Sequence, residues 1–216
     1  MGVEAIVFDW GGVLAGDVST GFADLEERVG VPAGSMPQLL GLHPCETDAA
    51  NLWHRRELGR ATALEWARWW CDRVQAAGGL SIPPELIVDS ESDRFSIAPN
   101  AVVIEAARRW KAAGYRLAVC TNNFTELGSV WRKRLPMDLF DAVVVSCEVG
   151  VRKPDPEMYA HVTEALDVAP TATVLLDDFA GNVDGARAVG WHAILVSNDH
   201  AAAIAELDAL LGSRET

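Results

Sequence analysis

The sequence predicts an α/β protein: a parallel sheet core that carries one inserted, all-helical domain. Short β-branched runs recur along the chain, and stretches of helical periodicity separate them after the first. These runs do not alternate apolar and polar residues, which is typical of parallel strands buried on both faces. Residues 16–95 hold no convincing strand and read as helices instead. Together these observations indicate a Rossmann-like core with a helical insert after its first strand.

Five strands are expected in the core, and the helices between them are plain. We expect strands at residues 3–8, 116–120, 141–146, 173–176 and 193–197. We expect core helices at residues 101–113, 123–135, 156–166 and 181–189. The resulting order of strand and helix predicts a sheet with helices on its faces.

The insert is expected to contain helices at residues 21–29, 47–58, 63–77 and 84–92. The third is the most informative, because Leu64, Ala67, Cys71 and Val74 form one apolar stripe and three tryptophans widen it. Such a helix is buried on more than one side. We therefore expect an α/β core domain at residues 1–15 and 96–216 and an all-helical inserted domain at residues 16–95.

Composition limits the partners of the chain. Its 216 residues include 18 Lys and Arg against 31 Asp and Glu, and the net charge of −13 argues against nucleic acid as a partner. The four cysteines show no metal-binding spacing, so we expect isolated thiols. No window approaches the ~20 apolar residues of a membrane helix, and no signal peptide is visible at the start. We expect a cytoplasmic protein without a membrane partner, of unpredicted oligomeric state.

Polar residues follow the ends of the predicted strands. Asp9 follows the first strand, Thr121 and Asn122 the second, and Asp177 and Asp178 the fourth. Lys153 comes shortly after the third strand, in the stretch GVRKPDP. Because ligands of open parallel sheets bind at the carboxyl ends of the strands, these side chains predict a site at that edge.

Each of these residues also has a purely structural interpretation. Asp9 before two glycines could start a turn, and Thr121 with Asn122 could cap a helix. Lys153 alone would be a solvated surface charge. The adjacent Asp177 and Asp178 are harder to explain in this way, because like charges behind an apolar strand repel unless a cation or hydrogen-bond donors compensate them. The occurrence of all of them at four strand ends favours a functional site.

Four ordered motifs carry a resemblance to a known family. They are FDWGGVL, VCTNN, the Lys-Pro of GVRKPDPEMY, and LLDDFAGNVDGARAVG. In these motifs the sequence resembles the haloacid dehalogenase superfamily, in the branch with a helical cap after the first strand. The match covers nearly the whole chain.

The resemblance implies a role for each motif residue. Asp9 would be the nucleophile that forms an aspartyl-phosphate, Thr121 would donate its hydroxyl to the phosphoryl oxygens, and Lys153 would offset charge. Asn122 and the backbone near Trp10 would bind phosphate. A Mg²⁺ ion would be held by the Asp9 carboxylate, the Gly11 carbonyl and Asp178, with Asp177 and Asn182 orienting the metal or its waters.

One position departs from the family pattern. Most phosphatases of the superfamily carry a second Asp, the general acid and base, where this sequence has Gly11. The protein could bind metal and phosphate without turnover, or it could act on a substrate whose leaving group needs no proton. Alternatively, another residue could donate the proton. Asp17, His43 and His54 are candidates for that donor.

The FDxGxV form resembles a sub-branch that includes sugar-phosphate phosphatases and the phosphatase domain of soluble epoxide hydrolases, which favours an active enzyme. Dehalogenases also lack the second Asp, but they use no metal and their fourth motif has no paired acids. We therefore expect a Mg²⁺-dependent phosphatase for a small phosphorylated metabolite, with a sugar phosphate as one candidate. A non-catalytic Mg²⁺- or phosphate-binding protein and a 2-haloacid dehalogenase are the alternatives.

Overall fold

A parallel sheet forms the centre of the molecule. The computed structural model describes residues 2–16, 23, 26–27, 30–35, 51–89, 98–128 and 130–212. Within these ranges five strands lie in the order β3-β2-β1-β4-β5. They are β1 (Ala5–Phe8), β2 (Arg116–Thr121), β3 (Ala142–Val145), β4 (Thr173–Asp177) and β5 (His192–Leu195), and all five predicted strands are thereby confirmed.

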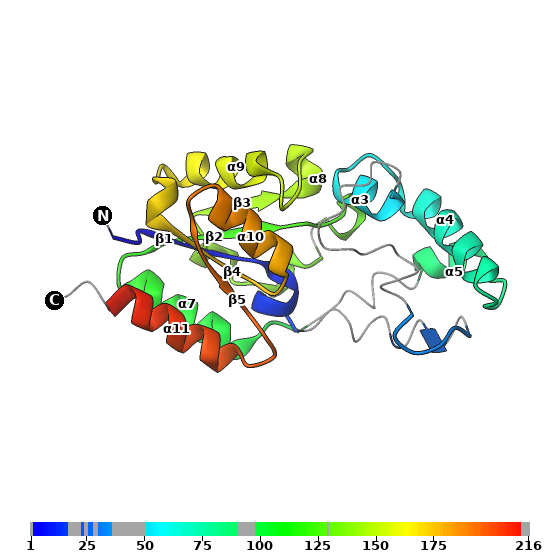
Figure 1. The fold of residues 1–216 in the computed structure, drawn as a ribbon, viewed down its shortest axis with the longest axis horizontal. Coiled ribbons are helices and arrows are strands. Elements are labelled where there is room, and N and C mark those ends of the chain that lie inside the picture. The colour runs from blue at the N-terminus through cyan, green and yellow to red at the C-terminus, as the bar shows by residue number, and fades with distance from the viewer. Residues whose placement is uncertain are drawn as a thin grey trace.

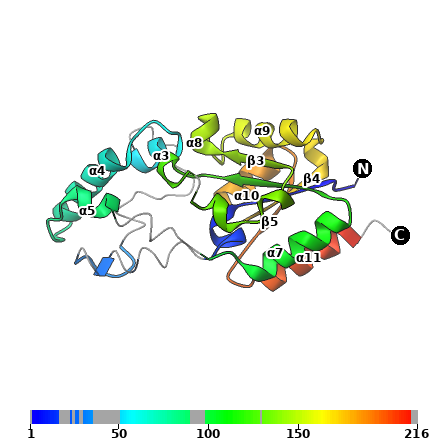
Figure 2. The ribbon, with the colours of Figure 1, turned by 180° about the vertical axis from the view of Figure 1, so that it is seen from behind.

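Helices cover both faces of this sheet. The upper face in Figure 1 carries α9 (Pro156–Leu166) and α10 (Ala180–Ala188), with the short α8 (Ser146–Val149) beside them. The lower face carries α7 (Ala101–Ala112) and α11 (His200–Gly212), as the reverse view in Figure 2 also shows. Alternate strand residues serve the two faces, so the core has two layers.

β1 illustrates why its residues are all apolar. Ala5 and Val7 pack in the cluster under α9 and α10, whereas Ile6 and Phe8 pack on the other side with Trp110 of α7. Every residue of β1 is buried. A strand that is covered on both faces needs an unbroken apolar run, as its sequence predicted.

The inserted helices lie beyond the end of the sheet to which the strands point. They are α3 (Leu52–Glu57), α4 (Ala63–Ala76) and α5 (Pro84–Asp89), and Figure 1 draws them at the right. The two chain segments that connect the insert to the core run side by side. The Gly16 amide donates to the Ala98 carbonyl at 3.1 Å, and the Asn100 amide donates to the Leu14 carbonyl at 2.8 Å. The insert therefore leaves and rejoins the core at one place.

The centre of the insert is aromatic. Trp66 and Trp70 of α4 are buried and stacked, and Trp53 of α3 packs edge-on against Trp66 and against Phe124 of the core. The Arg56 guanidinium lies over the rings of Trp66 and Phe124. These tryptophans build the core of the insert and join it to the sheet domain.

Some predicted elements differ from the structure. The expected helix at residues 123–135 is wrong, because two short 3₁₀ turns, η2 (Thr125–Leu127) and η3 (Arg132–Arg134), stand there instead. Asn123 accepts a bond from the Phe124 amide with its own side chain, which competes with helix formation. The helix predicted at 47–58 starts at Leu52, where Asn51 caps it, and residues 47–50 lie outside the described chain. Most of the helix predicted at 21–29 also lies outside it.

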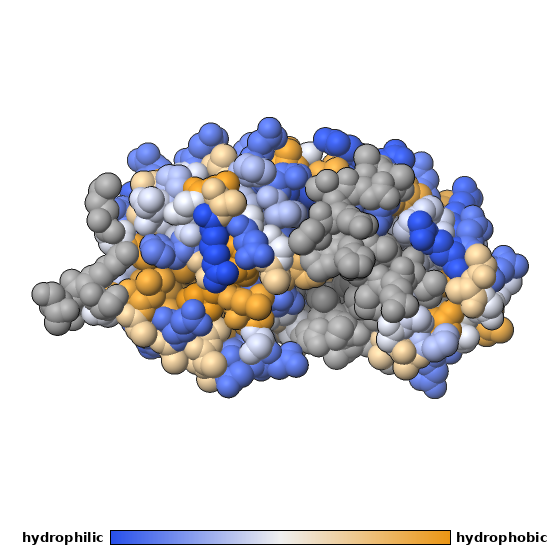
Figure 3. Space-filling model, viewed as in Figure 1, coloured by the Kyte–Doolittle hydropathy of each residue, from blue (hydrophilic) through white to orange (hydrophobic). Residues whose placement is uncertain are grey.

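The open edge of the sheet at β5 is partly covered by a side chain. Arg187 of α10 donates to the Ala193 carbonyl at 2.8 Å. Apolar residues gather over β5 and α11 in Figure 3, where Trp191, Ile194 and Leu210 line a shallow groove. A side chain that covers an edge strand from a neighbouring helix opposes pairing with another sheet.

Two chain-wide expectations can be compared with the described residues. Cys71, Cys120 and Cys147 are free thiols, while Cys45 lies outside the described part. No described helix combines the length and the apolar character that crossing a bilayer requires.

Candidate active site

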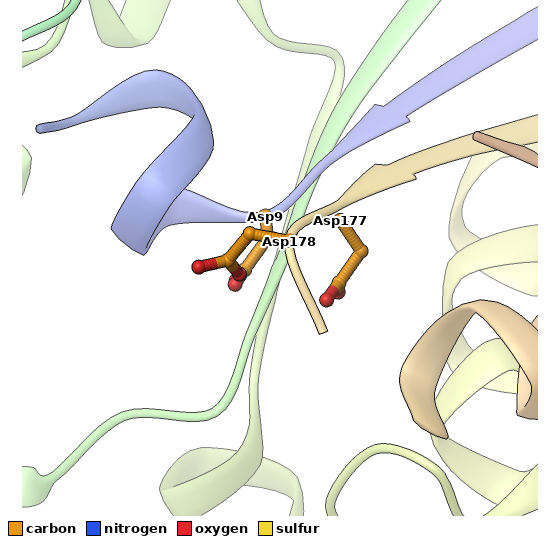
Figure 4. Close-up of side chains that lie close together, drawn as sticks. All are labelled: Asp9, Asp177 and Asp178. Carbon is orange, nitrogen blue, oxygen red and sulfur yellow. The ribbon is translucent and has the colours of Figure 1, made fainter. Parts of the chain in front are cut away.

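The candidate site lies where the strand order reverses. β1 sits between β2 and β4, and the chain winds outward from β1 to β3 on one side and from β4 to β5 on the other. Connections diverge at such a point and leave a crevice at the carboxyl ends of the strands. Asp9 follows β1 there, and Asp177 and Asp178 lie at the end of β4 (Figure 4).

Three carboxylates and one ammonium group meet in this crevice. Carboxylate oxygens of Asp9, Asp177 and Asp178 lie within 4.8 Å of one another. The Lys153 ammonium lies 3.0 Å from Asp9 Oδ1 and 2.6 Å from Asp177 Oδ2, and its side chain is fully buried. Lys153 is therefore an internal counter-ion and not the solvated charge that its sequence context alone would allow.

Asp177 is held by donors on both of its oxygens. Its Oδ1 accepts bonds from the Phe179 amide and from Asn182 Nδ2, each at 2.9 Å, while Oδ2 accepts the lysine bond. The Asn182 carbonyl in turn accepts from the Tyr159 hydroxyl at 2.7 Å. Asp177 thus orients Lys153 and is itself fixed by the start of α10.

Asn122 and Lys153 hold each other through the backbone of the lysine. The Lys153 amide donates to Asn122 Oδ1 at 2.8 Å, and Asn122 Nδ2 donates to the Lys153 carbonyl at 3.0 Å. This pair of bonds fixes where the lysine side chain starts. The neighbouring Thr121 is buried at the end of β2, as the sequence placed it.

The chain after Asp9 makes a wide turn, η1 (Trp10–Leu14), that is closed by a 2.7 Å bond from the Ala15 amide to the Trp10 carbonyl. Gly12 has a φ of +69°, and a Cβ at this residue would stand 2.1 Å from Asp178 Oδ2. The second glycine of the motif is therefore required twice, by its backbone conformation and by the approach of Asp178.

The electrostatics of the site favour a bound cation. Burial raises the pKa of Asp9 from 3.8 to about 6, although the nearby Lys153 ammonium opposes that rise. Burial, together with repulsion from Asp9 and Asp177, raises the pKa of Asp178 to about 7. The pKa of Lys153 is lowered by burial, but Asp177 and Asp9 outweigh this and hold it well above its usual value. One lysine does not balance three carboxylates, so negative charge remains.

The donor set suits a hard divalent cation. Asp9 and Asp178 offer carboxylate oxygens that lie close together in Figure 4, and Asp178 carries the larger pKa rise of the two. Oxygen ligands with room for water are what Mg²⁺ takes in proteins. The residues present therefore fit a magnesium ion.

Two further contacts at the site were not predicted from the sequence. His200 Nε2 lies 2.9 Å from the Gly12 carbonyl, which places the start of α11 against the turn after Asp9. Glu57 of the insert binds Arg152, the neighbour of Lys153. The stretch SNDH after the fifth strand was the available signal for His200, since it also follows a strand end. Glu57 left no comparable signal.

Three residues were candidates for the proton donor that Gly11 cannot supply, and one of them lies in the described part of the chain. His54 lies in α3 and is buried, and its role as a proton donor stays a prediction. Asp17 and His43 fall outside the described residues.

Comparison with known proteins identifies a matching family. Residues 3–190 match the family described as haloacid dehalogenase-like hydrolase. The chain is 28% identical over 225 residues to Bifunctional epoxide hydrolase 2 of Sus scrofa, a match that covers 98% of this chain and 39% of that protein. The chain thus spans well under half the length of this relative. It is 29% identical to Phosphatase MT3486 of Mycobacterium tuberculosis, with 91% of this chain and 88% of that protein covered.

Solved structures show the same fold. A dehalogenase has a TM-score of 0.69 at 19% identity, with 91% of this chain and 86% of that chain covered. A haloacid dehalogenase family enzyme of Bacteroides thetaiotaomicron, solved with magnesium and inorganic phosphate, has a TM-score of 0.64 at 16% identity and covers 90% of this chain and 94% of its own. With a family match over most of its length and a sheet of this topology, the chain belongs to the haloacid dehalogenase-like hydrolase family.

Proposed function

We propose that this protein is a magnesium-dependent phosphatase that hydrolyses a small phosphorylated metabolite through an aspartyl-phosphate. The observation that carries the proposal is the pairing of Asp9 with buried Lys153 on one side and Asp178 on the other. A relative named as a phosphatase, matched over most of both chains, supports this proposal.

With Asp9 as the nucleophile, the reaction has two displacement steps. A carboxylate oxygen of Asp9 attacks phosphorus, the bond from phosphorus to the leaving oxygen breaks, and water later cleaves the acyl phosphate. Lys153 would place its positive charge beside the phosphoryl oxygens, which become more negative during the transfer. Asp177 fixes its ammonium group and Asn122 fixes its backbone. Thr121 and the backbone amide of Trp10 would donate to the phosphoryl oxygens.

The magnesium ion would be held by Asp9, the Gly11 carbonyl and Asp178. Asp177 and Asn182 would orient this group through the network at the start of α10. When bound, the ion would neutralise the carboxylates and let a phosphate dianion approach them. A family enzyme of the same fold was solved with magnesium and inorganic phosphate, which supports a magnesium ion at this site.

The absence of an acid at residue 11 bears on the substrate. Positioned acid–base help is typically worth about 10²- to 10⁴-fold in rate. We propose that the leaving group departs without a proton, as an anomeric sugar phosphate, an acyl phosphate or an aryl phosphate can. The helices of residues 16–95 would act as the cap that closes over such a substrate.

The test uses p-nitrophenyl phosphate, whose leaving group needs no protonation. We expect hydrolysis in Mg²⁺, arrest by EDTA, and a loss of at least about 10³-fold in Asp9→Asn, since the nucleophile is removed. Asp184→Asn, an exposed aspartate of α10, is the matched control and should keep full activity.

A panel of phosphorylated metabolites with anomeric phosphates included would then identify the substrate class. Two results would contradict the proposal. Binding of beryllofluoride at Asp9 without turnover of any phosphate would indicate a non-catalytic protein. Release of halide from a 2-haloacid without added metal would indicate a dehalogenase.

A further inference from the structure

The Glu57 carboxylate joins helix α3 of the insert to Arg152 of the core through one oxygen and is held within α3 through the other. Glu57 Oε2 accepts from Arg152 Nε at 2.6 Å, and Oε1 accepts from Trp53 Nε1 at 2.9 Å. The side chains of Glu57 and Arg152 are only 8% and 10% exposed. This pair spans 95 positions of the sequence and ends at the residue before Lys153.

The backbone of Glu57 makes a second connection to the same region. Ser146 Oγ donates to the Glu57 carbonyl at 2.6 Å and accepts from the Asn123 amide at 3.0 Å. Asn123 follows Asn122, which holds the Lys153 backbone on both sides. Hydrogen bonds and peptide bonds therefore close a ring of six residues: Glu57, Arg152, Lys153, Asn122, Asn123 and Ser146.

The chain after Glu57 is pressed against the core as well. Gly59 has a φ of +67°, and a Cβ there would lie 2.8 Å from the Cys147 carbonyl oxygen. The Arg60 guanidinium donates to the Gly150 carbonyl at 2.9 Å. The end of α3 is thus seated along residues 146–152, the segment that leads to the lysine.

The ring is sensitive to the loss of either charge. Burial raises the pKa of Glu57, and Arg152 opposes that rise, so each group depends on the other. Removing one member of a buried ion pair leaves the other uncompensated, and the chain around it must rearrange. Because Arg152 is bonded directly to Lys153, such a rearrangement reaches the ammonium that lies 3.0 Å from Asp9.

We infer that Glu57 is a positioning residue for Lys153, through which the seating of the insert on the core sets the geometry of the nucleophile and its counter-ion. This inference rests on the proposed function, in which Lys153 supports phosphoryl transfer. It assigns to a residue of the inserted helices a part in the chemical step.

The test compares Glu57→Gln with Glu126→Gln. Glu126 also joins the insert to the core, through Arg56 at 3.4 Å and the Ala63 amide at 2.7 Å, but it lies outside the ring. Glu57→Gln should lower kcat about 10- to 100-fold with KM changed less than about threefold, since a misplacement near 1 Å can cost about 10²-fold. Glu126→Gln should change kcat by less than about threefold.

A second readout needs no turnover. The Lys153 amide is bonded to Asn122, so amide hydrogen exchange of residues 150–156 reports whether the ring is closed. We expect faster exchange in Glu57→Gln and unchanged exchange in Glu126→Gln. If the wild type hydrolyses no phosphate, the proposed function fails, and this comparison still tests the ring.

Two more variants guard against simple unfolding. Arg152→Lys keeps a cation beside Glu57 and should lie between the wild type and Glu57→Gln in kcat. The double variant Glu57→Gln/Arg152→Gln leaves neither charge of the pair without its partner. Its kcat should therefore exceed the kcat of Glu57→Gln and that of Arg152→Gln. Equal kcat losses in Glu57→Gln and Glu126→Gln, with unchanged exchange at 150–156, would overturn the inference.

Discussion

At the scale of single residues, the turn after Asp9 does not tolerate a side chain at Gly12. In Gly12→Ala the new Cβ would meet Asp178 Oδ2 at 2.1 Å in a backbone conformation with positive φ. We expect Mg²⁺ affinity to fall at least about tenfold, because Asp178 must move and second-sphere changes alone cost that much. Titration calorimetry with Mg²⁺ measures this.

Gly114→Ala is the control for the backbone alone. Gly114 also has a positive φ, of +93°, but nothing lies within 4 Å of its Cβ position. It should lower stability by about 1 kcal/mol and leave Mg²⁺ affinity unchanged. Equal losses of affinity in the two variants would refute the clash with Asp178.

The carboxylates of the crevice predict how magnesium stabilises the protein at different pH. Both folded pKa values, about 6 for Asp9 and about 7 for Asp178, lie above the usual 3.8. A raised folded pKa contributes stability at low pH that is lost as the pH rises through 6 to 7. A bound cation offsets this loss, so the rise in Tm caused by Mg²⁺ should be larger at pH 8 than at pH 5.5.

Thermal unfolding with and without Mg²⁺ at both pH values measures the effect. Asp178→Asn should flatten the difference, because it removes the group with the higher pKa. A Mg²⁺-induced shift that is larger at pH 5.5 would contradict the electrostatic account.

At the scale of elements, α10 approaches the Lys153 loop closely through Gly185. A Cβ there would lie 2.7 Å from Pro154 Cβ and 2.8 Å from the Tyr159 hydroxyl. Alanine favours a helix interior by roughly 0.5–1 kcal/mol over glycine, but overpacking costs more, typically about 1–3 kcal/mol. We expect Gly185→Ala to lower both Tm and kcat. Gly212→Ala in α11, with open space around it, should lower neither.

The elements also show which structures were predictable. The strands and α9 could be predicted because buried apolar runs and a Pro at the first turn act locally. The 3₁₀ turns near Gly128 could not be predicted, because the apolar residues there have the spacing of an α-helix. Their actual conformation depends on a side chain of the loop, Asn123, which accepts a bond from the backbone. No helix was expected at His200–Gly212, where alanines dilute the apolar pattern.

The same division applies to the site. Asp9, Lys153, Asp177 and Asp178 could be placed together because strand ends share one edge of the sheet. The use of Asn122 as a clamp on the Lys153 backbone and the contact of Glu57 with Arg152 depend on tertiary packing. Neither leaves a local pattern in the sequence.

At the scale of the whole molecule, the charge of −13 opposes the approach of an anionic substrate. Salt screens this repulsion, because the Debye length falls from about 30 Å at 0.01 M to about 8 Å at 0.15 M. At saturating Mg²⁺, the KM for p-nitrophenyl phosphate should fall several-fold over this range while kcat stays constant. Initial rates at fixed pH measure it, and a KM that rises with salt would show that the local positive field dominates.

The paired segments at Gly16 and Ala98 have a consequence for how such a protein can change. A module whose two ends are neighbours can be lengthened, shortened or exchanged while the bonds between these segments stay in place. The sheet keeps its chemistry while the module is free to drift in sequence. The contacts between the module and the core resist this drift, since a transplanted module must bring its own partners for Arg152, Phe124 and Glu126.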